Sequence, residues 1–200
     1  AGNNAYLSTG DLNDSLYDVT GAARVQQSVV NMGPYEDWGC LGYTSLYVDS
    51  SIAVAGLGNS WATALSSLQD AVHTAYICPQ VDTIYVAQGT YYPGPTENLI
   101  SQDTTFLIGK RLTILGGYPT GGGVRNVNTH PVVLDGSINL PNVVDNAYHV
   151  MTIVDATATD TVRLDGLTFK RGNAFGVGYN TLGGHSFSRG AGAGIVIYGP

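Results

Sequence analysis

The feature that most constrains the fold is a succession of short apolar segments, each ended by glycine, aspartate or both. After Pro79 these segments are three to six residues long. Short apolar runs rich in β-branched and aromatic residues, bounded by turn residues, predict β-strands. The expected strands lie at 45–49, 83–87, 105–108, 112–115, 132–134, 149–154, 162–164, 167–169 and 194–198.

One segment has a helical period. Between Trp61 and about Ile77, apolar side chains recur at steps of three and four and form one stripe, which predicts an amphipathic helix. The stripe consists of Leu65, Leu68, Ala71, Val72 and Ala75. Asn59 or Ser60 is the expected N-cap, and Pro79 prevents continuation.

Two β architectures compete for the strands. Asp135-Gly136 and Asp165-Gly166 fit the tight hairpins of an antiparallel sandwich. Connections of irregular length, together with the related phrases at 112–117, 133–136 and 163–169, favour a parallel β-helix instead. A solenoid exposes its apolar ends, so the amphipathic helix before the first coil is expected to be an N-terminal cap.

Charge excludes several classes of protein. The chain has 8 Lys and Arg against 15 Asp and Glu, a net charge of −7, and only 12% charged residues. A coiled coil needs more charge, and a protein that neutralises phosphates needs a basic surface, so no nucleic-acid partner is expected. No apolar run approaches the 18 residues of a membrane span. We expect these 200 residues to be a window on a larger protein, because the apolar strand at 194–198 ends the sequence.

The two cysteines, Cys40 and Cys78, are compatible with one disulfide and fit no zinc spacing. Low lysine content and abundant Tyr, Thr, Asn and Gly suit an extracellular protein, where a disulfide would persist. Two unpaired buried thiols remain the alternative.

Eight phrases follow one another in the order of a capping helix, first coils and glycine-rich later coils. They lie at 47–49, 59–62, 67–71, 82–93, 112–118, 164–169, 172–174 and 190–195. On these phrases, which span about three quarters of the chain, the sequence resembles bacterial right-handed parallel β-helix surface proteins of pectate-lyase-like fold. The resemblance implies an all-β fold, a right-handed parallel β-helix (solenoid) with an N-terminal amphipathic capping helix.

The first 36 residues resemble the C-terminal closing segment of the same family. The matching phrases are at 1–4, 18–25 and 30–36, with Asn31 where the family has Asp and Pro34 where it has Ala. This implies that residues 1–42 are a closing segment plus linker, and that 43–200 begin a second β-helix that continues beyond the window. A Cys40–Cys78 disulfide would then pin the linker to the cap.

Parallel β-helix folds include polysaccharide-cleaving enzymes, so carboxylates and basic side chains are candidate catalytic groups. The candidates are Asp135, Asp155, Asp160, Asp165, Lys170, Arg171 and Arg189. Asp135 and Asp165 sit in Asp-Gly turns, where aspartate typically bonds its own backbone. No closely spaced carboxylate pair of a glycosidase is evident. Asp155 and Asp160 could ligate calcium, but their spacing matches no known calcium loop.

The histidines His73, His130, His149 and His185 are isolated in sequence, and Gly183-Gly184-His185-Ser186 is interpreted as a glycine loop. No catalytic, cofactor-binding or metal-ligating residue is therefore predicted.

The leading hypothesis is a non-enzymatic extracellular structural or adhesive protein, a segment of a tandem β-helix fibre or adhesin at the bacterial cell surface. Its expected partners are neighbouring units of the same protein, identical subunits joined head to tail, and cell-surface glycans. The alternative is a polysaccharide lyase or glycoside hydrolase.

Overall fold

The computed structural model describes residues 25–26, 29–30, 42–94, 101–138, 145–154 and 161–198. The chain divides into two compact units, 1–42 and 43–200. In the first unit, β1 (Val25–Gln26) and β2 (Val29–Val30) pair antiparallel. The rest of the predicted closing segment, and Cys40, lie outside the described residues.

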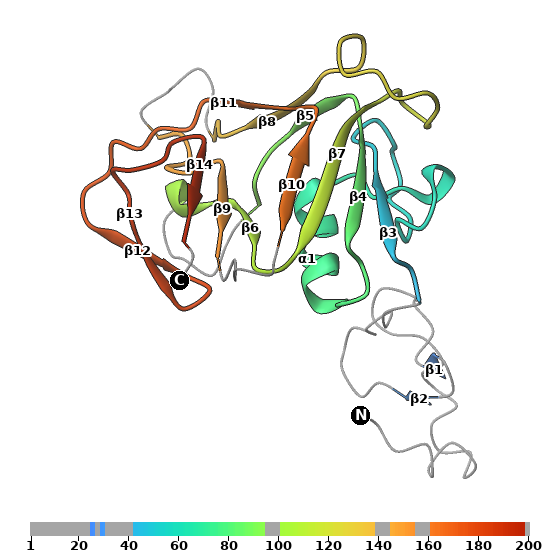
Figure 1. The fold of residues 1–200 in the computed structure, drawn as a ribbon, viewed down its shortest axis with the longest axis horizontal. Helices are drawn as coiled ribbons and strands as arrows, with labels where there is room; N and C mark the ends of the chain where they lie inside the picture. The colour runs from blue at the N-terminus through green and yellow to red at the C-terminus, as the bar shows by residue number, and fades with distance from the viewer. Residues whose placement is uncertain are drawn as a thin grey trace. The chain divides into compact units, whose positions relative to one another are not determined.

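The described part of the second unit contains three parallel sheets (Figure 1). The first has the order β10-β7-β4-β3, with β3 at Ser45–Val48, β4 at Thr83–Ala87, β7 at Leu112–Tyr118 and β10 at Val162–Asp165. The second has the order β11-β8-β5, with β5 at Gly89–Tyr91, β8 at Val132–Asp135 and β11 at Leu167–Lys170. The third has the order β14-β9-β6, with β6 at Phe106–Ile108, β9 at Met151–Ile153 and β14 at Ile195–Ile197.

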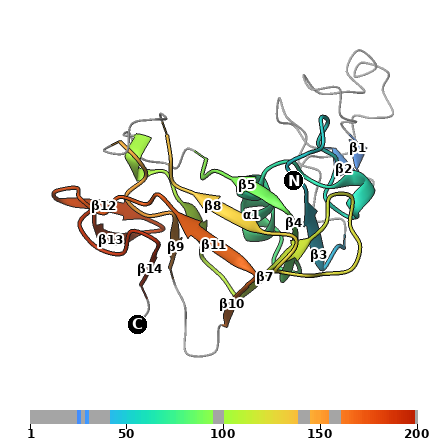
Figure 2. The ribbon, with the colours of Figure 1, turned by 90° about the horizontal axis from the view of Figure 1, so that it is seen from above.

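The chain visits the three sheets in rotation, from β4 to β5 to β6, and then from β7 to β8 to β9. Between β11 and β14 an antiparallel hairpin intervenes, formed by β12 (Tyr179–Leu182) and β13 (His185–Ser188), as Figure 2 shows at the far end of the ribbon from β3. Gly183 and Gly184 join its strands with φ of 54° and 79°, which glycine adopts without steric cost. The segment interpreted as a glycine loop is therefore the turn of a hairpin.

The predicted fold class is wrong. The expectation was an all-β right-handed parallel β-helix with a capping helix, whereas the described strands lie in separate small sheets and the fold is mixed, with one helix. The strands that carry the related phrases at 112–117 and 163–169 pair in parallel, with Ile114 opposite Leu164. Two of the related phrases thus lie on neighbouring strands, although the sheets are separate and not those of the expected solenoid.

The helix is shorter than predicted. Trp61–Thr63 form a 3₁₀ turn (η2), and the α-helix α1 runs over Leu68–Ile77. Its N-cap is Ser67, whose Oγ accepts a hydrogen bond from the backbone N–H of Asp70 at 3.2 Å, and not Asn59 or Ser60. Leu65, assigned to the apolar stripe, instead forms an isolated parallel bridge with Val48.

Apolar side chains from successive strands line up inside the unit. Leu46, Ile84 and Ile114 occupy adjacent register positions of β3, β4 and β7, and all are almost fully buried. Helix α1 contacts β3, β4 and β6 and buries Leu68, Ala71, Val72 and Ala75. This core fixes the strand ends from which the loops of the site emerge.

A second cluster of apolar side chains, which we call the aromatic quartet, consists of Tyr47, Trp61, Tyr85 and Tyr118. Each ring contacts two others of the quartet, with ring centroids 5.0 to 5.6 Å apart. Tyr47 and Tyr85 are register partners on β3 and β4, so the parallel pairing stacks them.

Candidate functional site

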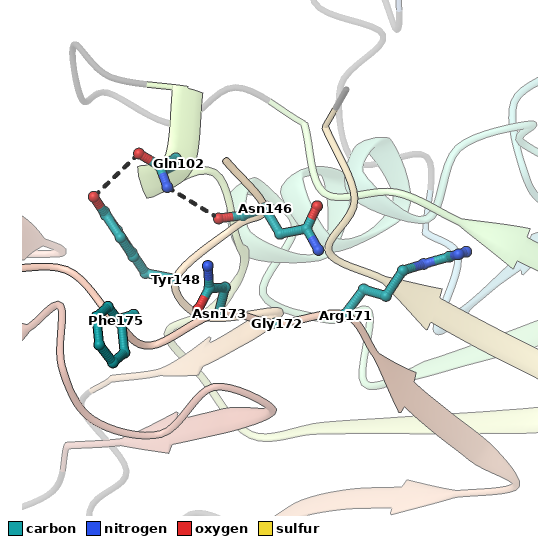
Figure 3. A pocket seen from close by; sticks show the side chains of 7 residues that line it. All are labelled: Gln102, Asn146, Tyr148, Arg171, Gly172, Asn173 and Phe175. Atoms are coloured by element: carbon teal, nitrogen blue, oxygen red, sulfur yellow. Dashed lines mark hydrogen bonds between the residues drawn. The ribbon is translucent and has the colours of Figure 1, made fainter. Parts of the chain in front are cut away.

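An open pocket of about 530 Å³ lies beside the ends of β8 and β11 (Figure 3). Its lining combines carboxamides, one arginine and two aromatic side chains. Most of the lining side chains are therefore polar, and the two aromatic rings supply apolar surface. The lining residues are Gln102, Asn146, Tyr148, Arg171, Gly172, Asn173 and Phe175.

Three passes of the chain, stacked by backbone hydrogen bonds, build the pocket. The N–H of Ala147 donates to the carbonyl of Gly136, and the N–H of Asn173 donates to the carbonyl of Ala147, both at 2.7 Å. The N–H of Tyr148 donates to the carbonyl of Gln102 at 2.8 Å. These bonds extend the stacking of the parallel sheets into the loops, so residues far apart in sequence face one cavity.

The carboxamide of Gln102 links Tyr148 to the backbone of Asn146 through a short chain of hydrogen bonds along one wall. The Tyr148 hydroxyl donates to Oε1 of Gln102 at 3.1 Å, and Nε2 of Gln102 donates to the backbone carbonyl of Asn146 at 3.5 Å (Figure 3). This chain orients Tyr148 and Gln102 relative to one another.

Asn146 is the most unusual residue of the lining. Its side chain is 2% exposed, and its buried Oδ1 has no hydrogen-bond partner among the described residues. A buried polar atom without a partner costs about 1–3 kcal/mol. An N–H or O–H group of a bound molecule that reached Oδ1 would supply the missing donor.

Arg171 lies where β11 ends. The β8–β11 register pairs Lys170 with Asp135, so the next residue, Arg171, reaches the same carboxylate. Its Nε donates to Oδ1 and Oδ2 of Asp135 at 2.8 and 3.1 Å, and its Nη2 donates to Oδ2. These bonds hold the pKa of Asp135 below its usual value, with Ser137 contributing further hydrogen bonds.

The backbone at Arg171 is strained, because its φ of 57° is the one positive value found at a non-glycine among the described residues. Such conformations cost about 1–3 kcal/mol and are concentrated at functional sites.

Tyr148 is fixed from two sides. The guanidinium of Arg189 lies 5.9 Å from the centroid of the Tyr148 ring and is itself bonded to Asp103 at 2.9 and 2.7 Å. On the other side, a Cβ at Gly176 would lie 2.5 Å from Cε1 of Tyr148, so the chain needs glycine at that position.

Phe175 lies at one side of the pocket and is 90% exposed, which is unusual for a large apolar side chain (Figure 3). The face of an aromatic ring is negative and attracts the slightly positive C–H groups of a ligand. Together, the rings of Phe175 and Tyr148 and the amides of Gln102, Asn146 and Asn173 can hold a molecule that has both an apolar face and several hydroxyl or amide groups.

Among the described residues considered for catalysis, the two aspartates have structural partners. Asp135 is bonded to Arg171 and, as its turn predicts, to the N–H of Ser137. Asp165 pairs with Arg125 and Arg163. Lys170 is exposed, and Asp155 and Asp160 lie outside the described residues.

The histidines are dispersed. His73 is exposed, His130 bonds Gln88 at 2.9 Å, and His185 stacks on Tyr198 at 4.4 Å. His149 is 2% exposed, and burial lowers its pKa. Over the residues that the structure describes, no cluster of three or more His, Cys, Asp or Glu side chains is placed to hold a metal ion.

Cys78 is buried at the C-cap of α1. Because Cys40 lies outside the described residues, the Cys40–Cys78 disulfide stays a prediction. None of the helices in the described ranges is long and apolar enough to cross a membrane.

No protein-family model, curated protein or solved structure matches this chain. The resemblance to β-helix surface proteins therefore stays a prediction. Sequence analysis identified Arg171 as a candidate but missed the amides and Tyr148, because single carboxamides and a single tyrosine carry no motif.

Proposed function

We propose that the protein is an extracellular structural or adhesive protein that binds saccharides in the pocket beside β8 and β11. The observation that carries the proposal is Asn146, an almost fully buried amide with an unpartnered oxygen in a pocket lined by aromatic rings and further amides. Hydroxyl groups of a sugar would supply the missing donor, and the apolar face of a pyranose ring would cover Phe175.

The sheets support the structural part of the proposal. Strands β10, β11 and β14 each lie at the edge of their sheet. Leu164 and Phe169 of the edge strands are half-buried, whereas their register partners Ile114 and Leu134 are fully buried. An edge strand whose apolar side chains are partly exposed can pair with a strand of a neighbouring unit or of an identical subunit.

The alternative of a polysaccharide lyase or hydrolase has no support from Asp135, Asp165 or Asp103, because each of these carboxylates is bonded to arginine. A general acid or base needs a carboxyl group that can exchange a proton with its substrate.

The proposal is tested by binding of the full chain to an immobilised panel of oligosaccharides, followed by titration of the best ligand. We expect Asn146→Ala to weaken binding about tenfold, because the amide contacts of the ligand are lost. Asn128→Ala, a change at an exposed amide that is not part of the pocket lining, is the matched control and should bind like the wild type.

Because Oδ1 of Asn146 has no partner among the described residues, Asn146→Ala should also change the free energy of unfolding in urea by less than about 1 kcal/mol. Absence of binding to every saccharide on the panel, or equal affinity of Asn146→Ala and the wild type, would contradict the proposal.

A further inference from the structure

The charged groups at the pocket define which saccharides it accepts. Two arginines border it, Arg171 in the lining and Arg189 against the ring of Tyr148. Each is bonded through two nitrogens to one aspartate, Arg171 to Asp135 and Arg189 to Asp103. Both arginines therefore have a carboxylate partner before any ligand arrives.

The two aspartates are bound firmly to their arginines. The side chain of Asp135 is 0% exposed and that of Asp103 is 1% exposed, so neither carboxylate can be hydrated if its arginine moves to a ligand. Removing one partner of a buried ion pair leaves an uncompensated buried charge, which costs several kcal/mol. The Nη1 side of Arg171 is not used by Asp135 and a ligand carboxylate could approach it, but the charge of the guanidinium is already neutralised by Asp135. Such a carboxylate gains the full charge of Arg171 only by displacing Asp135, at the cost of leaving that buried charge uncompensated.

The remaining polar groups of the lining are neutral. Gln102, Asn146, Asn173 and Tyr148 offer amide and hydroxyl groups, and the whole chain carries a net charge of −7, which repels anions at long range.

We infer, on the basis of the proposed function, that the pocket takes uncharged saccharides and discriminates against uronates, because the Asp135–Arg171 and Asp103–Arg189 pairs neutralise its cations. Besides stabilising the loops, the two ion pairs thus determine whether the pocket accepts charged or uncharged ligands.

A matched pair of ligands tests this without changing the protein. Tetragalacturonate and its fully methyl-esterified form share one sugar scaffold and differ in charge, and cellotetraose and chitotetraose extend the uncharged set. Titration calorimetry on the full chain should give at least one uncharged ligand that binds, and the esterified tetramer should bind at least about fivefold more tightly than the acid.

A variant then locates the cause. Asp135→Asn keeps the shape of the side chain and releases the charge of Arg171, so tetragalacturonate should bind about tenfold more tightly than to the wild type, while uncharged ligands change less than twofold. If Asp135→Asn does not fold, the pair of ligands on the wild type still decides the matter.

The outcomes separate the two proposals. Binding of the acid as tight as that of its ester overturns the inference and leaves saccharide binding in place. If Asp135→Asn folds but its affinity for the acid does not rise, neutralisation by Asp135 is wrong as the cause. Failure of every saccharide, charged or not, to bind overturns the proposed function and this inference with it.

Discussion

The aromatic quartet and the pocket both bring aromatic rings to the outside of the second unit, but they differ in what the rings contact. In the quartet, Trp61 and the three tyrosines contact one another in a closed circle. In the pocket, Phe175 is 90% exposed, and the amide of Asn146 lacks a partner for Oδ1 among the described residues.

The difference indicates how a surface group can be assigned to stability or to binding. Rings that pack against one another gain dispersion energy and burial in the unliganded protein. They therefore contribute to the free energy of folding without a ligand. A buried polar atom without a partner and an uncovered ring in the same pocket cost free energy that a ligand can recover. Substitutions in the quartet should therefore change folding, and those in the pocket should change binding.

The largest expected effect belongs to Trp61. Its ring contacts Tyr47 and Tyr118, and it lies so close to Gly122 that a Cβ there would be 2.3 Å from its Cδ1. Trp61→Ala should lower the free energy of unfolding by about 3 kcal/mol, measured by urea denaturation, and leave saccharide affinity unchanged. Trp61→Phe, which keeps a ring, should lose less than half as much. If Trp61→Ala lowers the free energy of unfolding by less than about 0.5 kcal/mol, the quartet does not have the structural role assigned to it.

Lys110 has the next largest expected effect. Its Nζ donates to the carbonyls of Ala75, Cys78, Pro79 and Val81 at 3.0, 3.3, 3.0 and 2.6 Å, at the C-terminal end of α1. A cation there satisfies carbonyls that have no partner in the helix and complements the helix dipole. Lys110→Met should cost about 2 kcal/mol in urea unfolding, while Lys170→Met, at an exposed position, should cost little. Similar losses in the two variants would contradict this role.

Much of the local structure could be predicted from the sequence because it depends on local composition. The strand expected at 83–87 was found with those limits, and the others expected in the second unit differ by up to a few residues at their ends. Two kinds of element were missed. The strand Gly89–Tyr91 contains only three residues, and the hairpin β12–β13 is marked in the sequence only by the two-residue turn Gly183-Gly184.

The pocket and the sheet organisation could not be predicted in the same way. Asp135 and Arg171 lie 36 positions apart, and only the β8–β11 register brings them together. Helix α1 begins at Leu68 and not at the predicted Trp61, because the Ser67–Asp70 cap determines its first turn more strongly than the apolar stripe does. A composition pattern defines elements, whereas pairing between distant strands defines a site.

Acid should affect the wall of the pocket through His149. Burial lowers the pKa of His149, whose Nδ1 lies 3.3 Å from the carbonyl oxygen of Gly192, while the Asp103–Arg189 pair is nearby. The unfolded chain therefore binds a proton more readily than the folded one, and stability should fall as pH drops below about 6.5.

Urea unfolding between pH 8 and pH 5 measures this effect. His149→Gln, which cannot titrate, should show a shallower decline than the wild type, whereas His73→Gln, at an exposed position, should follow the wild type. Parallel curves for His149→Gln and the wild type would exclude His149 as the source of the acid sensitivity.

Phe175 gives the smallest expected effect on stability and the sharpest contrast with Trp61. Because the side chain is 90% exposed, Phe175→Ala gives up little burial and should change the free energy of unfolding by less than about 0.5 kcal/mol. The same change removes the ring that would cover a sugar, so affinity should fall about fivefold, in line with roughly 1 kcal/mol for one aromatic contact. Calorimetric titration and urea unfolding of Phe175→Ala and Trp61→Ala form a crossed design, in which each variant should affect one measurement and not the other. If Phe175→Ala loses stability and keeps its affinity, the exposed ring is part of the fold, and the distinction between rings that stabilise and rings that bind does not hold for this protein.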